Sequence, residues 1–228
     1  MDPFSDSQAL ANWTASISRA GCIDEIASWR MVEYWFQVEL YRAAQSGKAG
    51  GWQHIGNYEH PYHTDLPRSG SKTNTKWIDL VFAEPRPEAP RRVVWCELKD
   101  IGRSQRTAEN NAKGLGHDLA ALWAIDPKKT KELWLNPMPH SMDHGRLDEW
   151  NRFGHGIDGG TQLISQIVLC HKSLCGALTL NRLQELWLAS FASKSELLQA
   201  LKLFPIAVSD TDEFNVLTLI GKPAHDSR

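Results

Sequence analysis

The sequence predicts a mixed α/β fold, with one mixed β-sheet as the core and helices on both of its faces. Residues 29–45 carry apolar side chains at the i, i+3, i+4 spacing of a packed helix. Several later segments are short apolar runs bounded by Gly, Pro, Asn or Ser, which is typical of strands. Helical and strand-like segments alternate along the chain, and this alternation favours a sheet covered by helices over an all-α or all-β fold.

The expected elements follow one another as a helix, three strands, a helix, a strand, a loop, a strand, a helix and closing strands. The first helical region, 9–46, is expected to break near Gly21, and the prolines at 85, 87 and 90 must lie in a loop because they cannot continue a strand ladder. The remaining predicted segments are strands at 52–66, 77–82 and 92–98, a helix at 106–125, a strand at 132–135, a loop or insertion at 136–160, a strand at 163–170, a helix at 181–203, and one or two strands within 206–220.

Length and composition indicate one domain that spans residues 1–228. Its core is expected within about 29–135, and residues 161–220 are expected to complete the sheet as a C-terminal α/β extension. The sequence has no apolar run of membrane-spanning length and no secretory signal, and its four cysteines are scattered, so a cytoplasmic protein is expected. The formal net charge of −2 argues against a generally basic nucleic-acid binder but leaves room for a locally basic groove.

Three charged residues interrupt apolar strands. Asp79 lies in the run Trp-Ile-Asp-Leu-Val-Phe, and Glu97 and Lys99 lie in Cys-Glu-Leu-Lys. Strand alternation places Glu97 and Lys99 on one face. A surface ion pair at a strand end would explain those two, but it would not explain Asp79, because a buried carboxylate is costly unless it is paired or binds a metal.

These residues predict a site for a hard divalent cation such as Mg²⁺, with Mn²⁺ able to substitute. The carboxylates of Asp79 and Glu97 and the backbone carbonyl of Leu98 would supply oxygen ligands. Lys99 would orient or help deprotonate a water and offset charge on a phosphoryl group. The chemistry that this set favours is metal-assisted hydrolysis of phosphodiester bonds.

The preceding helix offers a further acid. Glu33 and Glu39 flank its apolar stripe on opposite sides, and helical phase alone does not choose between them.

The order of these residues resembles that of the PD-(D/E)XK nuclease superfamily over residues 29–135, although Ile78 stands where that pattern often has a proline. The resemblance implies a restriction-endonuclease-like α-β-β-β-α-β core and a DNA endonuclease that acts in restriction, defence or repair. It also implies that Glu39, Asp79, Glu97 and Lys99 are catalytic, with Glu33 as the substitute helix acid. A homodimer would suit such an enzyme, because cutting both strands of a duplex needs two sites.

Arg103, Arg106 and Lys113 follow the third strand and are predicted to contact nucleic acid, against the alternative of a solvated polar loop. His117 and Asp118, in the next helix, are predicted to be a structural pair.

Two other functions are compatible with the sequence. One is an inactive nuclease-like module that binds nucleic acid or a protein partner. The other is a zinc enzyme that uses His60, His63 and Asp65, which is disfavoured because residues three apart on an extended strand face opposite sides.

Overall fold

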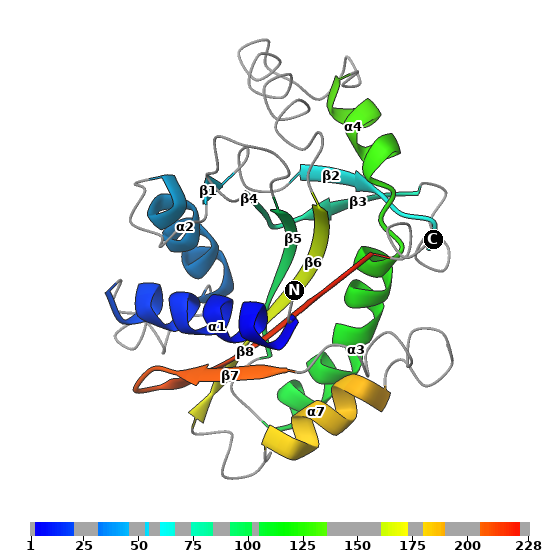
Figure 1. Cartoon of the computed structure of the whole chain (residues 1–228). Coiled ribbons are helices and arrows are strands. Elements are labelled where there is room, and N and C mark those ends of the chain that lie inside the picture. The colour runs from blue at the N-terminus through cyan, green and yellow to red at the C-terminus, as the bar shows by residue number, and fades with distance from the viewer. Residues whose placement is uncertain are drawn as a thin grey trace.

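A computed structural model (Figure 1) describes most of the predicted core. The described residues are 3–20, 32–45, 53–54, 60–66, 74–83, 92–101, 105–135, 161–172, 180–189 and 206–223.

The main sheet has six strands, in the spatial order β1-β4-β5-β6-β8-β7. β5 and β6 are parallel, and the other neighbouring pairs are antiparallel. The sheet is therefore mixed, as the sequence predicts. Its strands are β1 (Gln53–His54), β4 (Leu80–Ala83), β5 (Arg92–Asp100), β6 (Thr161–His171), β7 (Ala207–Asp210) and β8 (Phe214–Gly221).

Helices cover both faces of this sheet (Figure 1). α1 (Pro3–Ala20) and α2 (Val32–Gln45) pack on one face, and α3 (Gln105–Trp123) and α7 (Leu180–Ala189) pack on the other. β5 shows why two layers form, because its alternating side chains are apolar on both sides. Val94, Cys96 and Leu98 join the cluster under α1 and α2, while Val93 and Trp95 join the cluster under α3 and α7.

α3 lies in the connection between the parallel strands β5 and β6, which need a long crossover to run side by side. Its buried residues Ala112, Leu115, Leu119 and Leu122 recur every three or four positions and face the sheet. This helix brings polar side chains of its second half close to the end of β5, where the candidate site lies.

The predicted strand 77–82 is broken at Asp79, which the sequence does not reveal. β3 (Thr75–Ile78) pairs with β2 (His60–His63) in a separate two-stranded sheet, whereas β4 pairs with β5. The alternation of faces is interrupted there as well, because Ile78 packs under α3 whereas Leu80 packs under α2. The predicted strand 52–66 is split in the same way, into β1 of the main sheet and β2 of the small one.

The prediction of a strand at 132–135 is also wrong, because these residues end the helix α4 (Pro127–Leu135). The carboxylate of Asp126 accepts the Lys129 N–H at 3.0 Å, so Asp126 caps the helix, and Pro127 occupies its first turn. This start signal determines the local structure more strongly than the short apolar run that suggested a strand.

The other predicted elements are present where the chain is described. The helical region 9–46 forms α1 and α2, with α1 beginning at Pro3; strands 92–98 and 163–170 are β5 and β6; and 206–220 forms β7 and β8. Gly21, the loop 136–160 and the predicted helical residues 190–203 lie outside the described residues. No helix among the described residues is long and apolar enough to cross a membrane.

Replacement of Phe36 by alanine is expected to destabilise the fold by about 3–5 kcal/mol, because Phe36 is fully buried between α2 and the sheet. Tyr34→Ala, on the same helix but at an exposed position, is the matched control and should change the free energy of unfolding by less than about 1 kcal/mol. Urea denaturation followed by circular dichroism measures both. Equal losses for the two variants would contradict the packing of α2 described above.

Candidate functional site

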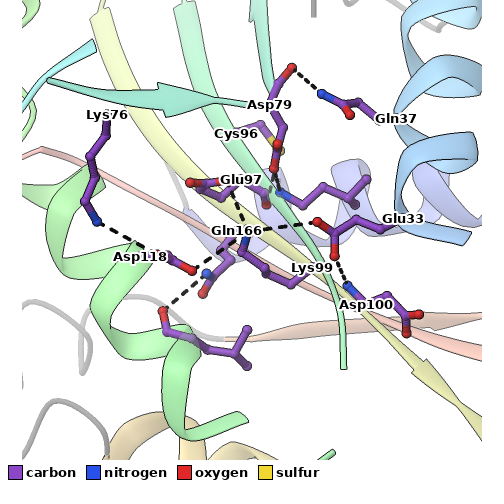
Figure 2. A network of polar contacts seen from close by, with 12 residues as sticks. Glu33, Gln37, Lys76, Asp79, Cys96, Glu97, Lys99, Asp100, Asp118 and Gln166 are labelled. Atoms are coloured by element: carbon purple, nitrogen blue, oxygen red, sulfur yellow. Dashed lines mark hydrogen bonds and ion pairs between the residues drawn. The ribbon is translucent and has the colours of Figure 1, made fainter. Parts of the chain in front are cut away.

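Asp79 lies at the break between β3 and β4, and its side chain holds the neighbouring strand. Its Oδ2 accepts the backbone N–H of Leu98 at 2.7 Å, in a position where β4 no longer pairs with β5 (Figure 2). Its backbone carbonyl accepts a hydrogen bond from Gln37 Nε2 of α2 at 3.1 Å. The bend is therefore fixed from both sides, and it directs the Asp79 carboxyl toward the end of β5.

Glu97 meets Asp79 there. Glu97 is only 6% exposed, and the carboxyl of Asp79 lies close enough to act on its pKa. Burial raises the pKa of Glu97 well above its ordinary value, and the like charge of Asp79 raises it further, against a smaller opposing effect of Lys99. Two carboxyl groups this close need either a shared proton or a cation between them.

The Lys99 ammonium lies among three carboxyl groups. Its Nζ is 3.7 Å from Glu97 Oε2, 3.8 Å from Asp118 Oδ2 and 4.0 Å from Glu33 Oε1 (Figure 2). Burial lowers the pKa of Lys99, but the surrounding carboxyls, Glu97 foremost, outweigh that effect and raise it. Lys99 therefore stays protonated. All three separations exceed hydrogen-bond length, which leaves the N–H donors available to a ligand.

Glu33, not Glu39, is the helix acid at this site, so the sequence-based preference for Glu39 is corrected. Glu33 Oε2 accepts the Asp100 N–H at 2.8 Å, and burial raises the pKa of Glu33 despite that bond. Glu39 pairs with Arg42 at 3.1 Å on another side of α2. The two glutamates are six positions apart on the helix, which turns their side chains about 120° apart.

Asp118 belongs to the site as well, although the sequence suggested only a structural pair with His117. Its two carboxylate oxygens lie near two lysines, Lys99 at 3.8 Å and Lys76 of β3 at 3.9 Å. His117, one position earlier on α3, is exposed. Helical phase would have allowed Asp118 to face the sheet, but only the crossover position of α3 brings it to Lys99.

Two buried polar atoms on the same side of the sheet lack partners within the described part of the chain. Gln166 of β6 lies opposite Glu97 in register; its Nε2 donates to the Leu115 carbonyl at 3.3 Å, but its Oε1 accepts nothing. The hydroxyl of fully buried Tyr62 also has no partner, and the nearby charge of Glu97 contributes to its raised pKa, after burial. Unpaired buried oxygens beside carboxylates are the groups that a hydrated cation satisfies.

The charges of this cluster also favour a cation. Four carboxyl groups, those of Glu33, Asp79, Glu97 and Asp118, face two ammonium groups, those of Lys76 and Lys99. If every carboxyl is ionised, two negative charges are left over, which one divalent ion would neutralise. Asp79 and Glu97 are the oxygen donors best placed for it. Leu98, the third predicted ligand, touches Asp79 through its amide, and a role for its carbonyl remains a prediction.

A second group that could hold a metal ion lies at the end of β2. Ligand atoms of His63, Asp65 and Asp126 lie within 4.8 Å of one another. The divergence expected along an extended strand concerned His60 and His63, whereas this group joins His63 to Asp65, where the chain bends after the end of β2. However, Lys129 Nζ lies 3.5 Å from Asp65 and 3.3 Å from Asp126, so these carboxylates already have a cationic partner.

The predicted nucleic-acid contacts are placed only in part. Lys113 is exposed on α3 and makes no ion pair with a described residue. Arg106 lies in the first turn of α3, but its side chain is not among those that the structure describes. Arg103 lies outside the described residues.

No protein-family model matches this chain, and the comparisons with curated proteins and with solved structures also find no match.

The metal-free protein is expected to lose stability as pH rises from 4.5, the ordinary glutamate value, toward the raised pKa of Glu97 in the folded state. Over this range the folded state retains a proton on Glu97 that the unfolded state has released, so the free energy of unfolding falls, by at most about 1.4 kcal/mol per pH unit. Glu97→Gln should remove most of this slope, whereas Glu39→Gln should keep it. Denaturation in EDTA at several pH values measures the effect. Parallel curves for wild type and Glu97→Gln would show that Glu97 does not titrate abnormally.

Metal binding is expected at Asp79 and Glu97. Titration with Mn²⁺, followed by electron paramagnetic resonance, should give a site whose affinity falls more than about tenfold in Asp79→Asn. Asp65→Asn should leave that affinity unchanged, because Asp65 lies in the second group, where its carboxylate is 3.5 Å from Lys129 Nζ. The reverse result, with binding lost only in Asp65→Asn, would assign the metal to the second group.

Proposed function

We propose that this protein is a divalent-metal-dependent nuclease that hydrolyses phosphodiester bonds in DNA. The observation that carries the proposal is the closeness of the Asp79 and Glu97 carboxyls beside the Lys99 ammonium. It combines two oxygen donors for Mg²⁺ with a fixed cation next to the position that a phosphoryl group would take.

The arrangement of elements supports the same proposal. The elements follow the order of the PD-(D/E)XK core. They are a helix acid on α2, an aspartate just before β4, a Glu-x-Lys on the antiparallel β5, and a crossover helix to the parallel β6. This support comes from the order of the elements and the geometry of the site. The helix acid that fits it is Glu33, and not Glu39.

In the proposed reaction Asp79 and Glu97 would hold Mg²⁺, and the ion would supply Lewis-acid chemistry to a phosphoryl oxygen and to a bound water. Lys99, held as an ammonium by its carboxyl neighbours, stabilises the negative charge that develops on the phosphoryl oxygens. It does not act as the base that the sequence allowed. Glu33 is the better proton acceptor, because burial raises its pKa and its Oε1 faces Lys99 while its Oε2 is held by Asp100.

Purified protein is expected to cleave plasmid or oligonucleotide DNA with Mg²⁺ or Mn²⁺ and to be inactive in EDTA. Asp79→Asn, Glu97→Gln and Lys99→Met should each lower the rate by at least about 100-fold, because each removes a group that acts in the transition state. The sharpest comparison lies within α2: Glu33→Gln should lower the rate strongly, while Glu39→Gln should cleave like wild type. Gel assays at matched protein concentrations measure the cleavage rates, and melting temperatures compare the folding of the variants.

Equal activity of the Glu33 and Glu39 variants would remove Glu33 from the mechanism. Metal-independent binding of DNA, without cleavage and unchanged in Asp79→Asn, would favour the alternative of an inactive nuclease-like module. Dimerisation and the predicted contacts of Arg103, Arg106 and Lys113 stay predictions.

A further inference from the structure

Among the described residues, two large apolar side chains are strongly exposed, and both adjoin site carboxylates in the sequence. Trp77 is 59% exposed and lies two residues before Asp79; Tyr34 is 45% exposed and directly follows Glu33. A single exposed aromatic residue is common on protein surfaces. Here both such residues adjoin carboxylates of the proposed site, one on a strand and one on a helix.

The position of Trp77 follows from the geometry of β3. Lys76 and Tyr62 are paired across β2 and β3 and share the face that turns inward, where Lys76 reaches Asp118. Trp77 pairs with Pro61 on the opposite, outward face. At about 3.3 Å per residue, the backbone of Trp77 lies about 7 Å from that of Asp79, roughly the length of one extended nucleotide. Trp77 therefore lies on the outward face of β3, two residues from Asp79, with its side chain open to solvent.

Tyr34 lies on the corresponding flank of α2. Glu33 reaches Lys99, and Gln37, one turn later, reaches the Asp79 carbonyl, so this side of the helix faces the site. Tyr34 is turned by about 100° from Glu33 toward solvent. The two aromatic residues thus adjoin residues of the cluster in sequence, one on the helix and one on the strand.

Charge limits the other ways in which DNA could bind. The formal net charge of the chain is −2, and the described site carries an excess of carboxyl groups over lysines. Within the described site, Lys76 and Lys99 are the cations that could attract a phosphate backbone, and both already lie beside carboxyl groups. Stacking of bases on aromatic rings does not need positive charge, but it needs bases that are not already stacked in a duplex.

We infer that the substrate is DNA with unpaired bases next to the scissile bond, and that Trp77 and Tyr34 bind these bases by stacking. This inference rests on the proposed function for the position of the scissile bond. It assigns Trp77 and Tyr34 to substrate binding rather than to catalysis.

The test is fluorescence anisotropy with a labelled single-stranded oligonucleotide and with the same sequence as a duplex, with Ca²⁺ in place of Mg²⁺. Trp77→Ala should weaken binding of the single strand by about 5- to 150-fold, the range for loss of one stacked base, and Tyr34→Ala should weaken it in the same direction. Trp77→Phe keeps an aromatic face and should restore most of the affinity. Duplex binding should not change, and the exposed side chain makes the melting temperature a suitable control for folding.

The inference is overturned if wild type does not bind the single strand, if Trp77→Ala binds it as wild type does, or if the variant loses single-strand and duplex affinity equally. The proposed nuclease activity is judged separately. If the Trp77→Ala variant cleaves duplex and single-stranded DNA as wild type does, the protein remains a nuclease but has no preference for unpaired bases. A protein that binds single strands through Trp77 without cleaving them retains the stacking surface and loses the proposed activity.

Discussion

The hydrogen bond from the Leu98 N–H to the Asp79 carboxylate is the interaction on which the site depends. At 2.7 Å it takes the place of a ladder bond at the point where the strand pairing of β4 with β5 stops. Because Asp79 supplies the acceptor from its side chain, its backbone is free to bend and β3 can leave the main sheet. The bend then delivers Lys76 and Tyr62 to the interior and Trp77 to the outward face of β3.

The same bend brings like charges together at a cost in stability. The buried Glu97 carboxyl lies close to Asp79, and its pKa is raised by burial and by that neighbour. Such an arrangement is unfavourable for folding in the absence of a cation, since a buried carboxylate without sufficient compensation is costly. Strain and unfavourable electrostatics of this kind are concentrated at functional sites, which is consistent with the proposed metal-binding role.

The sequence predicted Asp79, Glu97 and Lys99 because charged residues inside apolar strands are conspicuous, and strand alternation then placed Glu97 and Lys99 on one face. It did not resolve Glu33 from Glu39, since both flank the apolar stripe and only the direction from which α2 crosses β5 distinguishes them. Asp118 and Gln166 needed the crossover of α3 and the register of β6, which are long-range properties. Gln166 did leave a signal, as a polar residue in a strand that is otherwise mostly apolar.

The charge state of Lys99 links these features to the chemistry. A lysine in an apolar site would have a lowered pKa and could act as a base. Here carboxyl groups come from four elements, α2, α3, the β3–β4 bend and β5 itself, and their combined field exceeds the effect of burial. The ammonium is therefore permanent, and in the proposed reaction the proton from the attacking water would have to go elsewhere. Glu33 is suited to receive it because its own pKa is raised. The correction from Glu39 to Glu33 thus changes the proposed mechanism, and not only the identity of one residue.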